Sequence, residues 1–291
     1  MNKSSPSRFL LALSICIFSA LSIQTAFSQP APPPDPFLGL YFFENTNWLS
    51  ADGDAPISFS NIYHTPLWNN SGMLIDTTNE VPAFLNYNVV ETNGNTNITF
   101  DQGALRCVFI SDWASADSIQ NGSGPGQSAY LVAAGDFSSG STDGLWGIYF
   151  DPAGTNIYFG GVSNSTETVF VSSPISWRSN SLHFIGLVYT STNSTLYLDG
   201  NLAATGGAVS IVPSTNTWTN GFFVGSDGAG YEQARGVFDY LDFYNSNAFD
   251  SDWSNFFQPW YFTNSWNFLT NEYYTWSNGG GTFGPDLSGG F

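Results

Sequence analysis

The feature of this sequence that most constrains its fold is residues 183–245, where four strand-like runs follow one another with short turns between them. β-Branched and aromatic residues fill the runs and Gly, Asn and Asp separate them, which is the pattern of consecutive β-strands. Asp199-Gly200 is a favoured two-residue hairpin connection. The stretch therefore predicts antiparallel neighbours. The runs are residues 183–189, 195–201, 221–227 and 235–245.

The rest of the chain repeats this pattern of short β-rich runs bounded by turn-forming residues. No segment between residues 29 and 248 has a helical period of apolar residues. About a dozen short strands without helices predict an all-β fold, an antiparallel two-sheet jelly-roll sandwich. Residues 44–68 are expected to be rich in loops, and the polar, glycine-rich residues 111–128 to form a long surface loop. Further strands are expected at 38–43, 83–89, 98–100, 103–110, 130–134, 145–150, 155–159 and 168–172.

The first 28 residues have the pattern of a secretory signal peptide. Lys3 and Arg8 precede the apolar run 9–20, and residues 26–28, Ala-Phe-Ser, form a small-x-small cleavage site. No later segment approaches the length of a transmembrane helix. The prediction is a protein secreted through this signal, located outside the cell or at its surface, with no membrane span after cleavage.

The chain after the signal divides into three expected parts. Residues 29–36 form a proline-rich spacer, residues 37–258 the jelly-roll domain, and residues 259–291 a tail that is aromatic and then glycine-rich. A short helical turn capped by Asp250 or Ser251 is expected at the end of the domain. The aromatic part of the tail is expected to pack on the sandwich, and the glycine-rich part to be loose.

Signal cleavage changes the charge and the cysteine content. The positive residues that remain are Arg106, Arg178 and Arg235, against 23 acidic residues. This balance argues against nucleic acid, acidic membranes and polyanionic glycans as partners, since all of them need basic contacts. Adaptation to salt or plain solubility explains the acidity itself. Cys107 is left without a second cysteine, so no intrachain disulfide is expected and Cys107 is predicted to be a small buried hydrophobe.

Several of these runs resemble, in order, the motifs of the laminin-G-like, concanavalin-A-like jelly-roll domains of secreted bacterial proteins. The matching residues are 183–189, 196–200, 222–226 and 236–245, with 103–115 and 146–159 similar to a subgroup of the same domains. The resemblance covers about residues 38–245 and departs from the family at Leu182, where Trp or His is common. It implies a jelly-roll fold and extracellular binding or adhesion, without specifying a substrate.

Asp239 is the most informative acidic residue. Strand alternation places it on the same face as Val237 and Leu241, where a buried carboxylate needs a partner. An ion pair with Arg235 or backbone hydrogen bonds would satisfy it. A structural calcium ion held by Glu44 and Asp239 is the alternative, because the resemblance implies that the first and last strands are neighbours. Catalysis by Asp239 is the third alternative.

Known catalytic patterns of this fold are missing from the sequence. The β-glucanase arrangement Glu-x-Asp-x-x-Glu does not occur, since none of the six glutamates has Asp two residues later. The chain after the signal contains no Lys for lyase chemistry. His64 and His183 have no metal-ligand spacing, and His183 is predicted to be packed in a strand. The acid pairs at 52–54 and 250–252 are typical of turns and helix caps. The expectation is a protein that is not an enzyme.

Aromatic residues are the remaining positive signal, at 17% of the chain with ten Trp. Exposed aromatic rings stack on sugars, although most of these residues alternate as core residues do. Four tryptophans in or beside loops are the candidate ligand contacts. The leading hypothesis is a non-catalytic binding or adhesion module for neutral carbohydrate, on an extracellular polysaccharide or a cell-surface glycoprotein. The alternatives are a cell-envelope component that assembles through its tail and a divergent glycan-cleaving enzyme. The four candidates are Trp48, Trp68, Trp113 and Trp218.

Overall fold

The computed structural model describes residues 37–67, 71–78, 80–138 and 143–245, together with the short strands at 266–267 and 273–274. It confirms the predicted all-β, two-sheet antiparallel sandwich. The eight-stranded sheet pairs one strand with the next in a continuous order, and its central strand β15 also pairs with β1. Its strands are β13 (Asn201–Gly206), β12 (Ser194–Leu198), β11 (Leu182–Tyr189), β6 (Gly103–Ser111), β15 (Gly236–Tyr244), β4 (Ser71–Ile75) and β3 (Tyr63–Pro66), with β1 (Phe37–Tyr41) beside β15.

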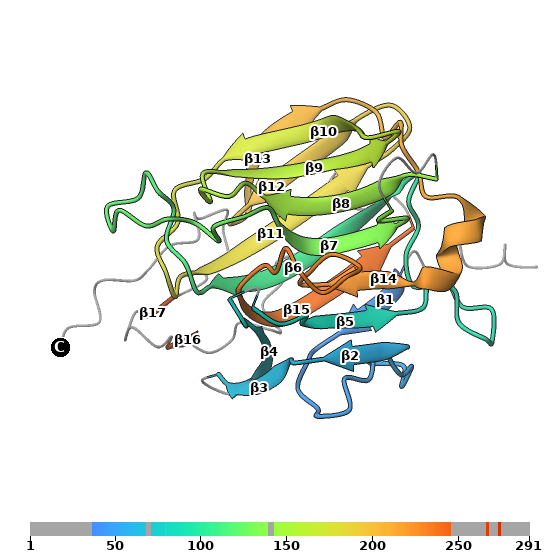
Figure 1. Cartoon of the computed structure of the whole chain (residues 1–291), viewed down its shortest axis with the longest axis horizontal. Coiled ribbons are helices and arrows are strands. Elements are labelled where there is room, and N and C mark those ends of the chain that lie inside the picture. The colour runs from blue at the N-terminus through green and yellow to red at the C-terminus, as the bar shows by residue number, and fades with distance from the viewer. Residues whose placement is uncertain are drawn as a thin grey trace, which may run out of the picture. The chain divides into compact units, whose positions relative to one another are not determined.

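A seven-stranded sheet forms the second layer, in front of the first in Figure 1. The 3₁₀ helix η1 (Thr215–Asn220) precedes β14, and the short strands β16 (Trp266–Asn267) and β17 (Tyr273–Tyr274) pair with each other. No helix among the described residues is long and apolar enough to cross a membrane. The strands of the second sheet, in order, are β10 (Thr166–Pro174), β9 (Asn156–Ser163), β8 (Leu145–Phe150), β7 (Ala129–Gly135), β14 (Phe222–Val224), β5 (Phe84–Tyr87) and β2 (Ser58–Ser60).

The core lies between the inner faces of the two sheets and is rich in aromatic rings. Trp146 of β8 is fully buried, with ring centroids 5.1 Å from Phe159 and 5.5 Å from Tyr189. Aromatic pairs at these distances add to the stabilisation from burial. Cys107 is buried here as predicted, and burial raises the pKa of its thiol well above the ordinary value. Among the described residues, 16 buried aromatic side chains therefore fill the space between the sheets.

Two local predictions differ from the structure. Residues 44–68 were expected to be mostly loop, but β2 and β3 lie there, and β4 follows directly. Residues 98–100 were expected to form a strand, yet Ile98 and Phe100 bury their side chains in the core from a loop. Short apolar runs do not distinguish a strand from a loop that buries two side chains. The signal peptide, the spacer and the helical turn near residue 250 lie outside the described residues.

Candidate functional site

The predicted buried carboxylate Asp239 lies at a β-bulge. The pairing of β15 with β6 skips Asp239, because Phe238 and Tyr240 lie opposite consecutive residues of β6. An extra residue reverses the alternation of faces. Leu241 consequently packs in the core between the sheets, whereas Val237 packs on the outer face of the eight-stranded sheet. The prediction that these side chains share one face with Asp239 is therefore wrong, although Asp239 is buried, with 6% of its surface exposed.

One of the two expected partners of Asp239 is paired with another carboxylate. Arg235 pairs with Asp76, at 3.1 Å from Nε to Oδ1, and its Nη1 donates to the carbonyl oxygen of Pro125 at 3.1 Å. Glu44 is exposed in the segment that follows β1. Within the described ranges, no group of three or more His, Cys, Asp or Glu side chains could hold a metal ion. Calcium at Glu44 and Asp239 stays a prediction, without a further acidic ligand in the described part.

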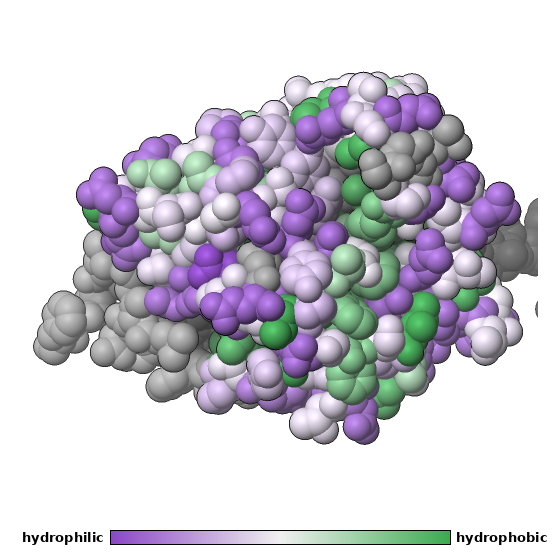
Figure 2. All heavy atoms as spheres, in the orientation of Figure 1, coloured by the Kyte–Doolittle hydropathy of each residue, from purple (hydrophilic) through white to green (hydrophobic). Residues whose placement is uncertain are grey.

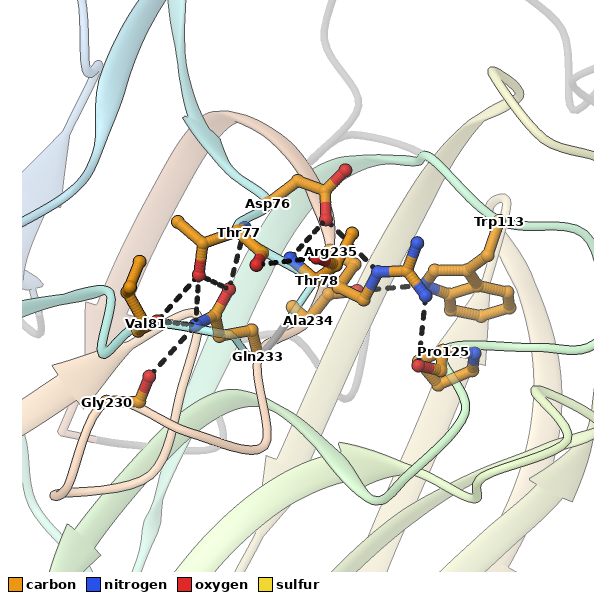
Figure 3. Close-up of polar contacts among 10 residues, drawn as sticks. All are labelled: Asp76, Thr77, Thr78, Val81, Trp113, Pro125, Gly230, Gln233, Ala234 and Arg235. Carbon is orange, nitrogen blue, oxygen red and sulfur yellow. Dashed lines mark hydrogen bonds and ion pairs between the residues drawn. The ribbon is translucent and has the colours of Figure 1, made fainter.

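A buried polar network ties together the loops that follow β4, β6 and β14 (Figure 3). Gln233 is fully buried, and its Nε2 donates to Thr77 Oγ1 at 2.8 Å and to the carbonyl oxygen of Val81 at 2.9 Å. Its Oε1 accepts the backbone N–H of Thr77 at 3.0 Å. Trp113 donates its indole N–H to the carbonyl oxygen of Ala234 at 2.8 Å. These bonds satisfy buried polar groups and hold the three loops in one arrangement.

Two carboxyl groups meet beside this network. Asp112 lies next to Asp76, and burial together with the neighbouring carboxylate raises the pKa of Asp112 to about 6. Burial acts to raise the pKa of Asp76 as well, but hydrogen bonds from Asp112 and Arg235 outweigh it and lower that pKa. One proton shared between the two carboxyl groups, with Arg235 alongside, explains both directions.

This pair predicts a dependence of stability on pH. Asp112 has an ordinary pKa of 3.8 and a folded pKa of about 6. Its contribution to the free energy of unfolding is fully present below pH 3.8 and is lost as the pH rises through 6. In Asp112→Asn, the amide donates to Asp76 at every pH, so the decline between these values flattens. Because Asp112 is exposed, we expect its contribution to the free energy of unfolding to be less than about 1 kcal/mol. Urea unfolding at several pH values across this range measures the decline in the free energy of unfolding, and the exposed Asp117→Asn is the control. An equally steep decline with pH in wild type and Asp112→Asn would contradict the shared proton.

The four candidate tryptophans occupy different environments. Trp48 and Trp113 lie in the core with 3% and 4% of their surfaces exposed, and Trp113 stacks on Trp177 at 6.0 Å. Their loops fold back onto the core, so a loop position did not imply an exposed ring. Trp218, in η1, is partly buried against the core and keeps part of its surface accessible. Trp68 lies outside the described residues.

His183 is the packed strand histidine that was predicted. Its ring stacks on Trp177 at 3.9 Å, its Nδ1 lies 2.9 Å from Asp199 Oδ2, and its Nε2 lies 2.8 Å from Ser181 Oγ. The order Ser, His, Asp is that of a hydrolase triad. The Ser181 hydroxyl, however, also donates to the carbonyl oxygen of Arg178 at 2.5 Å. The group therefore acts as a brace that joins β11 to the β12–β13 hairpin.

A set of aromatic side chains on the outer face of the seven-stranded sheet is the best candidate for ligand contact. We call it the aromatic surface. Tyr149 stacks on Tyr158 at 5.4 Å and contacts Tyr130 at 5.3 Å, across three neighbouring strands. Phe223 continues the surface onto β14, where Figure 2 shows apolar residues gathered over β14 and β5. Its six members are Phe84, Tyr130, Phe137, Tyr149, Tyr158 and Phe223.

Carboxylates surround the tyrosine half of this surface. Glu167 accepts a hydrogen bond from the Tyr149 hydroxyl. Burial and the charges of Glu232, Glu167 and Asp227 raise the pKa of Tyr130 above its ordinary value. Burial, followed by the charge of Asp227, also raises the pKa of Glu232. Aromatic rings beside hydrogen-bond acceptors offer both a stacking platform and partners for hydroxyl donors, so the arrangement can bind a polyhydroxylated ligand.

The sequence did not single out this surface. Its members come from five strands and one loop between residues 84 and 223. Outward-facing aromatics are indistinguishable from core aromatics when the strand alternates large residues on both faces, as β8 does with Trp146 and Tyr149. The only sequence signal for an outward-facing Tyr149 was that it alternates with the more apolar residues at positions 146, 148 and 150.

Residues 110–252 match the laminin G-like family model described as the concanavalin A-like lectin/glucanases superfamily. This part of the chain, just under half of it, is similar to that superfamily, and the resemblance predicted from the sequence is confirmed. No match was found among curated proteins.

Three solved structures are distantly similar to this chain. A Trypanosoma rangeli sialidase in complex with the inhibitor DANA is 16% identical with a TM-score of 0.47, over 74% of this chain and 31% of that chain. Domain 4 of AbnA, a GH43 extracellular arabinanase from Geobacillus stearothermophilus in complex with arabinotriose, is 10% identical with a TM-score of 0.49. The match covers 73% of this chain and 93% of the arabinanase domain. The binding domain of botulinum neurotoxin serotype D is 10% identical with a TM-score of 0.48. The match covers 73% of this chain and 49% of the neurotoxin domain. The chain spans about a third of the length of the sialidases that it matches.

Proposed function

We propose that this protein is a secreted, non-catalytic binding or adhesion module that holds neutral carbohydrate on its aromatic surface. The observation that carries the proposal is the aromatic surface itself: on the outer face of one sheet, the partly exposed Phe84, Phe137 and Tyr158 lie beside three buried aromatic rings and several carboxylates. A core explains the aromatics between the sheets, but it does not require tyrosines stacked on the outer face. Carbohydrate of an extracellular polysaccharide or a cell-surface glycoprotein is the corresponding ligand.

The charge of the surface favours a neutral sugar. The ionic groups around Tyr130 are Glu167, Asp227 and Glu232. Of the three described arginines, Arg106 is paired on the other sheet, Arg235 is paired with Asp76, and Arg178 is exposed in the segment between β10 and β11. Carboxylates accept hydrogen bonds from sugar hydroxyls but repel sulfated, phosphorylated or uronic groups. Nucleic acid is disfavoured for the same reason.

Two of the three carboxylates beside the aromatic surface are used in local hydrogen bonds, which supports binding without catalysis. Glycoside hydrolysis needs two carboxyl groups facing each other across the scissile bond. Glu167 is held by the Tyr149 hydroxyl, and Asp227 accepts the backbone N–H groups of Ala229 at 3.1 Å and Tyr231 at 2.6 Å to shape its own loop. Glu232 is then the one carboxylate of the three without such a role.

The test is retention of the mature protein on insoluble and arrayed neutral polysaccharides, followed by substitution of Tyr158. This tyrosine is partly exposed and stacks on Tyr149, so Tyr158→Ala removes stacking area at little cost to folding. We expect Kd for the retained glycan to rise about tenfold or more, corresponding to roughly 1.4 kcal/mol. Isothermal titration calorimetry or affinity electrophoresis measures the change.

Tyr63→Ala is the matched control, because Tyr63 is 55% exposed on β3 in the other sheet. Its Kd should equal that of the wild type. Equal losses in both variants, or no loss at Tyr158, would rule out the aromatic surface as the site. No retention of the wild type on any glycan would contradict the proposed function, and release by a chelator would move the site toward a calcium-dependent one.

A further inference from the structure

The outer face of the eight-stranded sheet is apolar and shielded from solvent. Its five main side chains are between 3% and 9% exposed and form a cluster separate from the core. In a two-layer sandwich, the outer face of an antiparallel sheet is ordinarily polar and solvated. The described members of this cluster belong to strands of this sheet, with Leu67 just beyond β3. The five are Val108, Ile110, Leu182, Phe184 and Val237.

A buried ion pair on the same face gives a second, independent sign of a covered surface. Arg106 and Asp242 lie opposite each other on β6 and β15, and the Asp242 side chain has no exposed surface. Tyr240 and Tyr244 donate their hydroxyls to Asp242 and accept from Arg106. Arg106, with 17% of its side chain exposed, and the two tyrosines enclose Asp242, so this part of the outer face is poorly solvated.

The chain itself supplies a suitable occupant. β15 lies between β6 and β4, carries Val237 and Asp242 on this face, and ends at Tyr244. The tail, residues 246–291, begins two positions after the end of this strand. Residues 253–276 contain eleven aromatic side chains, and residues 246–291 contain no Lys or Arg. The apolar cluster crosses four strands, roughly 15 Å, which about five extended residues can span.

We propose that residues 246–291 cover the outer face of the eight-stranded sheet in the same molecule, with aromatic side chains of residues 253–276 packed on the apolar cluster. The tail is then a third layer of the domain and completes the burial of the Arg106–Asp242 pair. This role does not depend on the glycan-binding proposal, since the aromatic surface lies on the other sheet.

The first test uses photo-crosslinking in the full-length protein. Tyr197 borders this face beside Val188 and is partly exposed, so p-benzoylphenylalanine at position 197 places a probe there without filling the core. We expect crosslinks within one chain to peptides of residues 246–291, identified by mass spectrometry. The same probe at Tyr158, on the other sheet, should give none of these. Crosslinks only between two chains, or none to this segment from position 197, would overturn the proposal.

The second test loosens the contact. Val108→Asp puts a carboxylate in the centre of the cluster, and cleavage by chymotrypsin after aromatic residues of 253–276 should become at least tenfold faster. Val169→Asp, at a position 43% exposed on β10, is the control and should leave the rate unchanged. Circular dichroism verifies that both variants keep their β-structure; if Val108→Asp unfolds, crosslinking at position 197 still decides. Wild-type cleavage as fast as that of the isolated peptide, or protection that grows with protein concentration, would contradict docking within one molecule.

Discussion

Replacing Arg106 with methionine lowers the free energy of unfolding by about 3–5 kcal/mol. Methionine fills much of the same volume, but it leaves the fully buried Asp242 carboxylate without its counter-ion. Arg106 Nε donates to both oxygens of Asp242 at 3.0 Å, and Nη2 reaches Tyr240 at 2.9 Å and Tyr244 at 2.7 Å. Removing one partner of a buried pair costs more than the pair contributes, because the remaining charge is unsatisfied.

The free energy of unfolding that Arg106→Met loses should increase as the pH rises. Burial raises the pKa of Asp242, and the adjacent guanidinium counteracts this. Without Arg106 the folded pKa rises further, so the variant regains stability as the pH falls and Asp242 takes up a proton. Chemical denaturation between pH 5 and 8, a range chosen around neutrality, should therefore show the largest loss at the alkaline end.

Two variants make this result specific. Arg178→Met removes an exposed arginine and should change the free energy of unfolding by less than about 0.5 kcal/mol. Arg106→Met combined with Asp242→Leu should recover much of the loss, because no charge is left buried. A loss of under 1 kcal/mol in Arg106→Met alone would show that Asp242 is hydrated in solution, which would also count against the covered face proposed above.

Trp146→Ala should destabilise the domain by about 3–5 kcal/mol, because it opens a cavity where the two sheets meet. The ring lies at 5.1 Å from Phe159, 5.5 Å from Tyr189 and 5.4 Å from Phe100, and none of its surface is exposed. Rigid strands on both sides limit how far the site can collapse. Denaturant unfolding followed by circular dichroism measures the loss.

Trp146→Phe should cost much less than Trp146→Ala. It keeps most of the apolar volume and removes an indole N–H that has no hydrogen-bond partner among the described residues. Trp218→Ala is the matched control, since this tryptophan is only partly buried, and about 1–2 kcal/mol is expected. Similar losses for Trp146→Ala and Trp218→Ala would contradict the central position of Trp146 in the core.

Local chemistry predicted those parts of the fold in which neighbouring residues decide the structure. Asp199 and Gly200 have φ of 50° and 78° and connect β12 to β13 as their sequence indicated. The central strands β6, β8, β11 and β15 lie where period-two alternation and turn residues placed them. The short strands β2, β3 and β4 were missed, because pairing with longer strands stabilises them and their own sequence does not.

The candidate site depended on contacts between distant segments. The bulge at Asp239 changes which side chains of β15 face the core, and an extra residue in one strand is visible only against its partner. Trp48 is buried because its segment folds against β3, where its ring lies 4.7 Å from His64. The aromatic surface was likewise assembled by strand order, which brings β7, β8 and β9 side by side.

The sequence by itself determined the all-β class, the antiparallel hairpins, the family resemblance and the burial of Cys107. The class, the hairpins and the burial of Cys107 follow from residue spacing and turn chemistry within about ten neighbouring residues, whereas the resemblance rests on several motifs in order along the chain. Only the tertiary structure decided which sheet carries the stacked tyrosines, which arginine meets which carboxylate, and which tryptophans are core. Those outcomes depend on the register between strands far apart in the chain, and a shift of one residue in that register exchanges the two faces of a sheet.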